Sequence, residues 1–159
     1  MIFVILGTHE LPFTRLLKEV ERLKKNGVIE GEVVVQSGHT SFKSDVMTMI
    51  DFMSYEEMER YFDEANYIIT HGGTGSIVTA AKKGKKIIAA ARLIKYHEHN
   101  DDHQLEIIRQ FVEAGHILEW KDGEDMADVI RQLSSFHPVP FVSGHKQILS
   151  LLEDFIDQL

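Results

Sequence analysis

Short apolar runs alternate with longer amphipathic segments along this chain of 159 residues. Residues 2–6 are apolar at every position, which is typical of a strand buried on both faces of a parallel sheet. After Pro12 the apolar residues recur three or four positions apart, and this pattern ends near Gly27. The stripe consists of Phe13, Leu16, Leu17, Val20 and Leu23. The pattern therefore predicts a buried strand followed by an amphipathic helix.

The alternation continues through the rest of the chain. Further strands are predicted at residues 32–36, 46–52, 67–70, 86–90 and 116–120. Further helices are predicted at about 54–65, 76–83, 103–114, 124–134 and 145–158. Ser54 and Glu57 form a capping box at the start of the first of these helices. Because strands alternate with helices, we expect one α/β domain over residues 1–159, with a Rossmann-like, doubly wound parallel sheet.

The last predicted helix carries an apolar stripe that has two interpretations. The stripe packs into the core of the domain, or it docks on another chain because the helix lies at the end of the sequence. Its members are Ile148, Leu151, Leu152, Phe155, Ile156 and Leu159.

Composition narrows the classes of protein to which the chain can belong. Hydrophobic residues make up 43% and charged residues 26%, which is an ordinary balance for a folded domain. The formal net charge of −8 argues against a nucleic-acid partner, because such partners are bound largely through neutralised phosphates. Cysteine is absent, which excludes disulfides and cysteine nucleophiles. No segment resembles a signal peptide or a membrane span, so we expect a soluble cytoplasmic protein.

Three loops predicted to follow strands are rich in glycine, hydroxyl groups and histidine. They are Gly7-Thr8-His9, Gln36-Ser37-Gly38-His39 and His71-Gly72-Gly73-Thr74-Gly75-Ser76. We expect them to lie together, because ligands bind doubly wound sheets beyond the carboxyl ends of the strands. In the third loop the glycines allow a close approach to the backbone, and the helix predicted to begin at Ser76 presents its N-terminal amides to an anion such as a diphosphate. The alternative is a tight strand-to-helix turn without a ligand.

Two well-known phosphate motifs do not fit this loop. A P-loop requires a lysine directly after its second glycine, and Ser76 follows Gly75 here. The dinucleotide fingerprint requires a third glycine and a place after the first strand, and this loop meets neither condition. A diphosphate bound at this loop would therefore be held without either of these two motifs.

A polar segment at residues 96–104 contains three histidines and three carboxylates. Its spacing is not typical of a metal site, so we favour a helix cap at Asp101 or Asp102 over metal ligation. Such a cap places His103 and Gln104 in the first helical turn, where they could donate hydrogen bonds to sugar hydroxyls or to a phosphate.

Five motifs occur together in an order and spacing that resemble one family. They are Gly7-Thr8-His9-Glu10 with Pro12-Phe13, Ser54-Tyr55-Glu56-Glu57-Met58, His71-Gly72-Gly73-Thr74-Gly75-Ser76-Ile77, Gly84-Lys85-Lys86, and Arg92 followed by His99-Asn100-Asp101-Asp102-His103-Gln104. Over nearly its whole length the chain resembles the C-terminal-domain family of glycosyltransferase family 28, and within it the PssE-type β-1,4-galactosyltransferase enhancers of capsule and exopolysaccharide synthesis. The resemblance implies half of a GT-B glycosyltransferase, in which two Rossmann-like domains close over the active site. The other half would be a membrane-anchored chain that binds the acceptor.

The resemblance also implies which residues contact a UDP-sugar donor. The diphosphate is expected at Gly73, Thr74, Gly75 and Ser76, with His71 and Gly72 just before them, the sugar at His103 and Gln104, the uracil at Gln36, Ser37, Gly38, Phe52 and Met53, and the interdomain cleft at Gly7, Thr8 and His9. Relatives often carry a glutamate that binds the ribose at the position of Thr79. Ribose recognition is therefore expected either to be looser or to be supplied by Glu98 or by the partner chain.

By the same resemblance, the reaction would be an inverting transfer of a hexose, of the galactose or N-acetylglucosamine type, to a lipid-linked saccharide in polysaccharide biosynthesis at the cytoplasmic face of the membrane. Loop amides and a helix N-terminus would stabilise the UDP leaving group without a cofactor or metal. His9 is either the general base or only a turn residue, and the base could also lie on the partner. Because of Thr79, a non-catalytic enhancer that activates a partner glycosyltransferase is the alternative function. A dinucleotide-binding dehydrogenase is disfavoured by the incomplete fingerprint.

Overall fold

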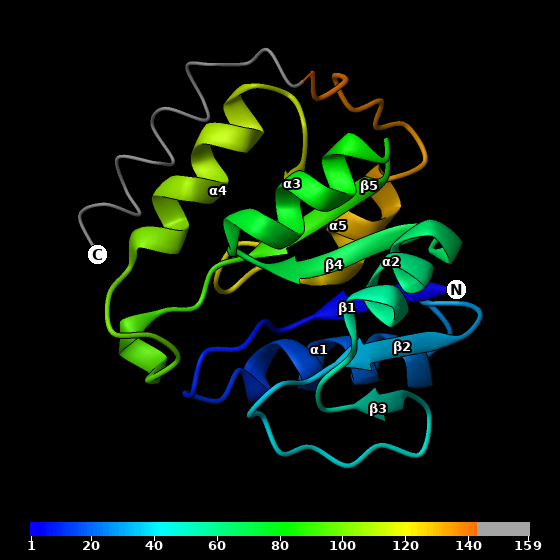
Figure 1. The fold of residues 1–159 in the computed structure, drawn as a ribbon, viewed down its shortest axis with the longest axis vertical. Coiled ribbons are helices and arrows are strands. Elements are labelled where there is room, and N and C mark those ends of the chain that lie inside the picture. Colours follow the sequence, from blue (N-terminus) through cyan, green and yellow to red (C-terminus); the bar gives the residue numbers. More distant parts are fainter. Residues whose placement is uncertain (143–159) are drawn as a thin grey trace.

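All strands of the sheet run parallel, as the alternation of strands and helices predicts. The computed structural model describes residues 1–142, and its six strands follow the order β3-β2-β1-β4-β5-β6 (Figure 1). The strands are β1 (Ile2–Ile5), β2 (Val33–Gln36), β3 (Thr48–Ile50), β4 (Tyr67–His71), β5 (Lys86–Ala90) and β6 (Leu118–Glu119). The chain extends the sheet in one direction from β1 to β3 and then in the other from β4 to β6. The prediction of a doubly wound α/β sheet is confirmed.

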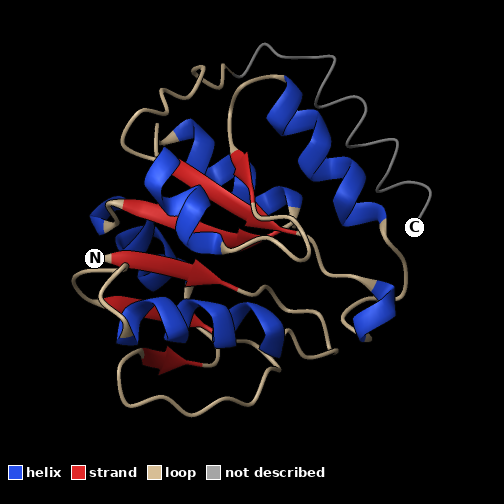
Figure 2. Ribbon diagram, turned by 180° about the vertical axis from the view of Figure 1, so that it is seen from behind, coloured by secondary structure: helices blue, strands red, loops and turns tan. Residues whose placement is uncertain are grey.

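Helices cover both faces of this sheet. They are α1 (Thr14–Lys25), α2 (Tyr55–Glu64), α3 (Thr74–Lys82), α4 (His103–Glu113) and α5 (Met126–Gln132), together with a 3-10 turn, η1 (Ile94–Tyr96). One hydrophobic cluster joins the sheet to α1 and α5, and a second joins it to α2, α3 and α4. Figure 1 shows the second group of helices in front of the sheet, and Figure 2 shows the opposite face.

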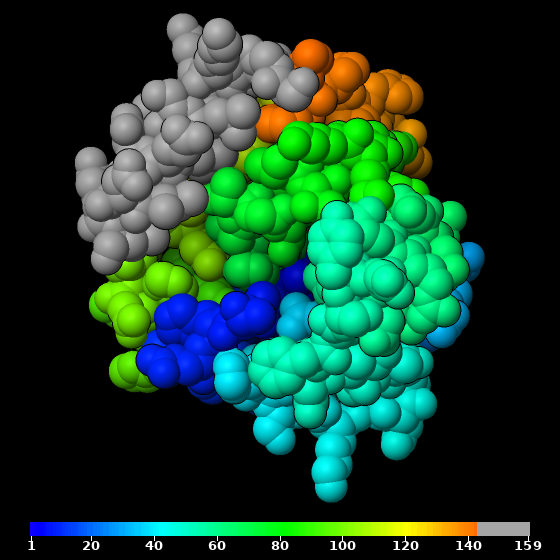
Figure 3. Space-filling model, in the orientation of Figure 1, coloured from blue at the N-terminus to red at the C-terminus, as the bar shows by residue number. Residues whose placement is uncertain are grey.

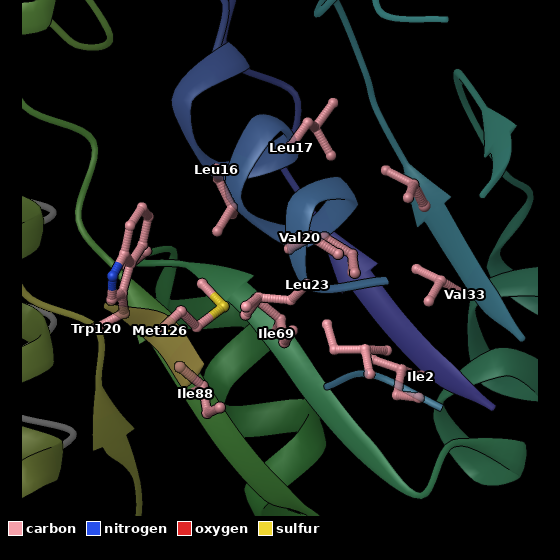
Figure 4. Packing of buried hydrophobic residues seen from close by; sticks show 14 of the residues in the cluster. Ile2, Leu16, Leu17, Val20, Leu23, Val33, Ile69, Ile88, Trp120 and Met126 are labelled. Atoms are coloured by element: carbon pink, nitrogen blue, oxygen red, sulfur yellow. The ribbon is translucent and has the colours of Figure 1, made fainter. Parts of the chain in front are cut away.

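The uninterrupted apolar run of β1 results from burial on both faces. Phe3 points into the cluster with α2, α3 and α4, whereas Val4 points into the cluster with α1 and α5, and neither side chain has measurable exposure. Figure 4 shows the helical stripe of α1, including Leu16 and Val20, directed at strand residues such as Ile69. Each fully buried aliphatic or aromatic side chain of this kind contributes about 1.5–3 kcal/mol.

Element boundaries differ from the predicted ones mainly at the edges of the sheet. The strands predicted at 46–52 and 116–120 shorten to Thr48–Ile50 and Leu118–Glu119, because each pairs on one side only. The helix predicted to begin at Ser76 begins at Thr74 instead, with Gly73 as its N-cap. Gly75 and Ser76 therefore lie in the first helical turn and not in the loop, which brings the helix N-terminus closer to the end of β4.

The capping box predicted at the start of α2 is confirmed. The Ser54 side chain accepts a hydrogen bond from the backbone of Glu57, and the Glu57 side chain accepts one from the backbone of Ser54. The helix predicted at 145–158 and its apolar stripe lie outside the described residues. Within residues 1–142, no helix is both long enough and apolar enough to cross a membrane.

Candidate functional site

A cavity of about 260 Å³ opens at the carboxyl edge of the sheet, beside the point between β1 and β4 where the chain reverses its direction of winding. Figure 3 shows a hollow there, where the blue, cyan, teal and green segments meet. The cavity is lined by Gly7, Thr8, Gln36, Phe52, Met53, Met58, His71, Gly73 and Gly75. All but Met58 were predicted from the sequence. Met58 lies four residues after Ser54 and four before the buried Phe62, a helical spacing that could have indicated it.

Three cavities are larger. Two of them, of about 480 and 670 Å³, share Arg15, Trp120 and Asp122 in their linings, and the third, of about 530 Å³, lies between α4, β6 and α5. None of the three is lined by a residue of the glycine loops after β1, β2 and β4. The smaller cavity is the candidate site, because it lies where parallel α/β sheets bind ligands and where the predicted loops meet.

The first turn of α3 faces the candidate site without a cap. Its N-cap residue is Gly73, which has no side chain to bond the free amides, and its first turn contains no acidic residue. In contrast, α2 has its capping box and α5 begins with a hydrogen bond from Ala127 to Asp125. Free N-terminal amides carry partial positive charge. A Cβ added at Gly75 would meet no atom within 4 Å, so this turn has space beside it for a ligand.

The imidazole of His71 fits between two glycines. A Cβ at Gly7 would lie 2.5 Å from His71 Nε2, and a Cβ at Gly73 would lie 2.2 Å from His71 Cε1. Gly7 also has a φ of +80°, which side chains rarely adopt. Burial is the largest cause that lowers the pKa of His71, to about 3, so the ring is neutral at physiological pH.

Gln104 sets the orientation of the His71 ring. Its Oε1 accepts hydrogen bonds from the backbone amides of Gly72 and Arg92, both at 3.0 Å. The other end of the amide group, Nε2, must therefore donate, and it lies 3.2 Å from His71 Nδ1. His71 consequently carries its proton on Nε2, the atom between the two glycines. The buried side chain of Gln104 is thus bonded within the protein, and its predicted contact with a sugar stays a prediction.

His9 also presents a donor and not a base. Its Nδ1 accepts a hydrogen bond from the backbone amide of Leu11 at 3.1 Å, which places the proton of the neutral ring on Nε2. Burial first, and then the nearby His99 and Arg92, lower the pKa of His9. A general base requires a free nitrogen lone pair. The expectation that His9 is the base therefore does not fit this hydrogen bond.

The loops after β1, β2 and β3 are held together by residues at the end of β2 and directly after it. Gln36 Oε1 accepts from the amide of Gly7 at 3.0 Å, and Gln36 Nε2 donates to the carbonyls of Gly7 at 3.2 Å and Asp51 at 3.1 Å. Ser37 Oγ donates to a carboxylate oxygen of Asp51 at 3.1 Å. A Cβ at Gly38 would lie 2.2 Å from the carbonyl oxygen of Gly7. These residues give the cavity its shape, and of the three Gln36 lines it.

Phe52 and Met53 form an apolar rim of the cavity. Phe52 is 54% exposed, and its ring makes an edge contact with His39 at a centroid distance of 5.1 Å. An exposed aromatic face beside a polar cavity suits a flat heterocycle. The placement agrees with the predicted position of a uracil, which stays a prediction.

Glu98 and His103, which were also predicted to contact the donor, do not line the cavity. The carboxylate of Glu98 is buried, and both of its oxygens accept hydrogen bonds from Arg15 at 3.0 Å. It also accepts from the amide of Leu93, so it is not available for a ribose as predicted. His103 begins α4, as the predicted cap at Asp101 or Asp102 implies, and its amide donates to Asp101 at 2.9 Å.

In the described part of the chain, no three histidine, aspartate or glutamate side chains converge in a way that could hold a metal ion. The glycine loops, the neutral imidazoles and the free helix amides together offer hydrogen-bond donors around one small cavity. Such an arrangement of donors suits an anionic group.

Comparison with known proteins shows the family to which the chain belongs. The profile of the glycosyltransferase family 28 C-terminal domain matches residues 1–159. The chain belongs to this family. It is 28% identical over 139 residues to a Candida glabrata protein named UDP-N-acetylglucosamine transferase subunit ALG13, covering 87% of this chain and 62% of that protein. A Candida albicans protein of the same name is 30% identical over 77 residues, which cover 48% of this chain and 25% of the relative. The chain thus spans less than two thirds of the length of either relative.

Solved structures support the family 28 fold. The solution structure of ALG13 has a TM-score of 0.60 at 20% identity, covering 95% of this chain and 93% of that one. The Acinetobacter baumannii MurG structure has a TM-score of 0.51 at 17% identity, covering 83% of this chain and 40% of that one. A glycosyltransferase of kitacinnamycin has a TM-score of 0.58 at 14% identity, covering 98% of this chain and 39% of that one. In the last two cases the family 28 chain corresponds to less than half of a larger glycosyltransferase.

Proposed function

We propose that this chain binds a UDP-sugar with the diphosphate at the start of α3, and that it is the donor-binding half of a two-chain glycosyltransferase. The observation that carries the proposal is the uncapped first turn of α3 beside the cavity, with open space at Gly75. The names of the two Candida relatives support the nucleotide and the subunit character.

Transfer of the sugar leaves UDP with increasing negative charge on its β-phosphate. The amides of Thr74, Gly75 and Ser76 would stabilise that charge, because they are already oriented and need no rearrangement during the reaction. The Nε2–H of His71 would add a neutral donor from the opposite side of Gly73. An acceptor hydroxyl would attack the anomeric carbon from the face opposite UDP, losing its proton to the general base while the bond to UDP breaks, so the sugar would be transferred with inversion. No divalent metal would be needed, so transfer should continue in EDTA.

A second chain would complete the site. The cavity of about 260 Å³ is smaller than the usual range for ligand pockets, roughly 300–1,000 Å³, so it encloses only part of a nucleotide sugar. A membrane-anchored partner would cover the donor, bind a lipid-linked saccharide at the cytoplasmic face and supply the general base. Polysaccharide or capsule synthesis is the proposed setting, with a hexose of the galactose or N-acetylglucosamine type as the transferred sugar.

The test is a titration of the isotope-labelled chain with UDP, followed by the NMR shifts of its backbone amides. UDP should produce saturable shifts at residues 72–76, whereas ADP and NAD should not. Saturable shifts at these residues with NAD, and none with UDP, would contradict the proposal.

The second candidate function is a non-catalytic enhancer of a partner glycosyltransferase. The observation that favours it is Thr79, which stands half-buried on α3 where family relatives often carry a ribose-binding glutamate. An enhancer would leave the amides of residues 72–76 unaffected by UDP in the presence of the partner, and would still raise the rate of the partner's own transfer reaction.

A further inference from the structure

Arg92 is the largest fully buried side chain of the described residues, with an exposure of 1%. It follows β5, and its guanidinium donates to the carbonyl of Leu6 at 2.6 Å, just beyond the end of β1. It also donates to the carbonyls of Leu11 at 2.7 Å and Glu98 at 3.0 Å. Because β4 lies between β5 and β1, the side chain crosses the carboxyl end of β4, where His71 begins the glycine loop.

The guanidinium of Arg92 shares its nearby carboxylate, that of Glu98, with Arg15. All three hydrogen bonds of its guanidinium go to neutral carbonyl groups, and its Nε is buried without a hydrogen-bond partner. The nearby Glu98 carboxylate makes its two ionic hydrogen bonds with Arg15. The guanidinium groups of the buried Arg92 and the partly exposed Arg15 therefore share one carboxylate, and the Phe13 ring, 5.1 Å from Cζ of Arg92, adds a cation–π contact but no negative charge. An incompletely paired buried charge is costly unless another charge compensates it.

The field of Arg92 reaches the candidate site. After burial, its charge contributes to the lowered pKa values of His71, which lines the cavity, and of His9, where the carboxylates of Glu10 and Asp101 act in the opposite direction. Burial lowers the pKa of Arg92 itself to about 10, so it remains charged at physiological pH. At neutral pH the cavity therefore has neutral donor groups at its surface and a fixed cation behind them.

We propose that Arg92 is an electrostatic positioning residue, whose buried and incompletely paired charge selects the phosphate groups of the ligand at the start of α3. This inference rests on the proposed UDP-sugar site. The alternative is that Arg92 only ties three loops together, in which case its loss would affect all parts of the ligand alike.

The test compares UDP with uridine, which lacks the phosphates, by isothermal titration of the wild-type chain, Arg92→Gln and Arg131→Gln. Arg131 is the matched control, because it is an exposed arginine in the last turn of α5 and pairs with Asp128. Arg92→Gln should weaken UDP binding about tenfold or more and leave uridine binding within about twofold, since the lost interaction is Coulombic. Arg131→Gln should change neither. Equal losses for UDP and uridine, or no loss, would overturn the role of Arg92.

Glu98→Gln provides a test that does not require Arg92 to be replaced. This variant removes the shared counter-charge and keeps an oxygen that can accept from Arg15. It should strengthen UDP binding and leave uridine binding unchanged. If Arg92 only ties the loops together, or if Glu98 binds the ribose, Glu98→Gln should instead weaken UDP binding. Arg92→Lys should retain most of the preference for UDP over uridine. If wild-type protein binds no UDP, the proposed function itself fails; if it binds UDP and Glu98→Gln weakens that binding, only the inference on Arg92 fails.

Discussion

Replacement of Gly75 by alanine should make the protein more stable and, at the same time, weaken its affinity for UDP. Gly75 lies in the first turn of α3, and its Cβ would meet no atom within 4 Å. Its φ lies outside the left-handed region, so alanine fits the backbone without strain. Alanine stabilises a helix by roughly 0.5–1 kcal/mol relative to glycine, because glycine loses more freedom on folding.

The two effects have different assays. For a chain of this length, about 1 kcal/mol corresponds to a rise in Tm of roughly 2–4 °C, which circular dichroism measures during heating. The added methyl group would occupy the space beside the free amides that the diphosphate needs, so calorimetric titration should show UDP binding weakened at least about tenfold. Gly75→Val, with its larger side chain, should remove measurable binding and keep the fold.

Gly84→Ala is the matched control for this change. A Cβ at Gly84 would also meet no atom within 4 Å, but this residue follows α3 with a φ of +70°. Alanine there should destabilise the protein by about 1 kcal/mol and leave UDP binding unchanged. Wild-type affinity for UDP in Gly75→Ala would refute the placement of the diphosphate at α3. A fall in Tm for Gly75→Ala would refute the conclusion that alanine fits the helical backbone at this position without strain.

Two further predictions concern residues behind the cavity. Gln104→Ala should lower the free energy of unfolding by about 2 kcal/mol or more, because the buried amides of Gly72 and Arg92 lose their acceptor. Urea denaturation measures this loss, with Gln110→Ala on the same helix as the control. Equal urea midpoints for the two variants would contradict the role of Gln104. His71 should make stability fall below about pH 6.5, because its folded-state pKa of about 3 lies below the ordinary value of 6.5 and the unfolded chain therefore binds the proton more tightly. Between pH 7 and pH 5 the wild-type protein should lose roughly 1–2 kcal/mol more unfolding free energy than His71→Gln, and parallel losses in the two proteins would contradict a buried neutral ring.

The sequence by itself determined the fold class, most elements and the location of the candidate site. Apolar runs and helical stripes are local properties of the sequence. A chain that alternates them is typical of parallel βαβ units, and few other folds suit such a pattern. The loops around Gly7, Gln36 and Gly73 were expected to meet because each follows a strand of the same sheet. The structure places all three around one cavity.

Only the tertiary structure decided what the polar side chains of this region do. Gln104 contacts a backbone amide 32 residues away, and Arg92 contacts a carbonyl 86 residues away. Such partners are absent from any local pattern, so Gln104 and Glu98 could be assigned to a ligand from the sequence although both are bonded within the protein. Arg92 lies in one of the five motifs that resemble family 28, but the sequence alone assigned no role to its side chain. The protonated nitrogen of a histidine depends on the group that faces its other nitrogen, and for His9 and His71 the folded structure alone supplies that group.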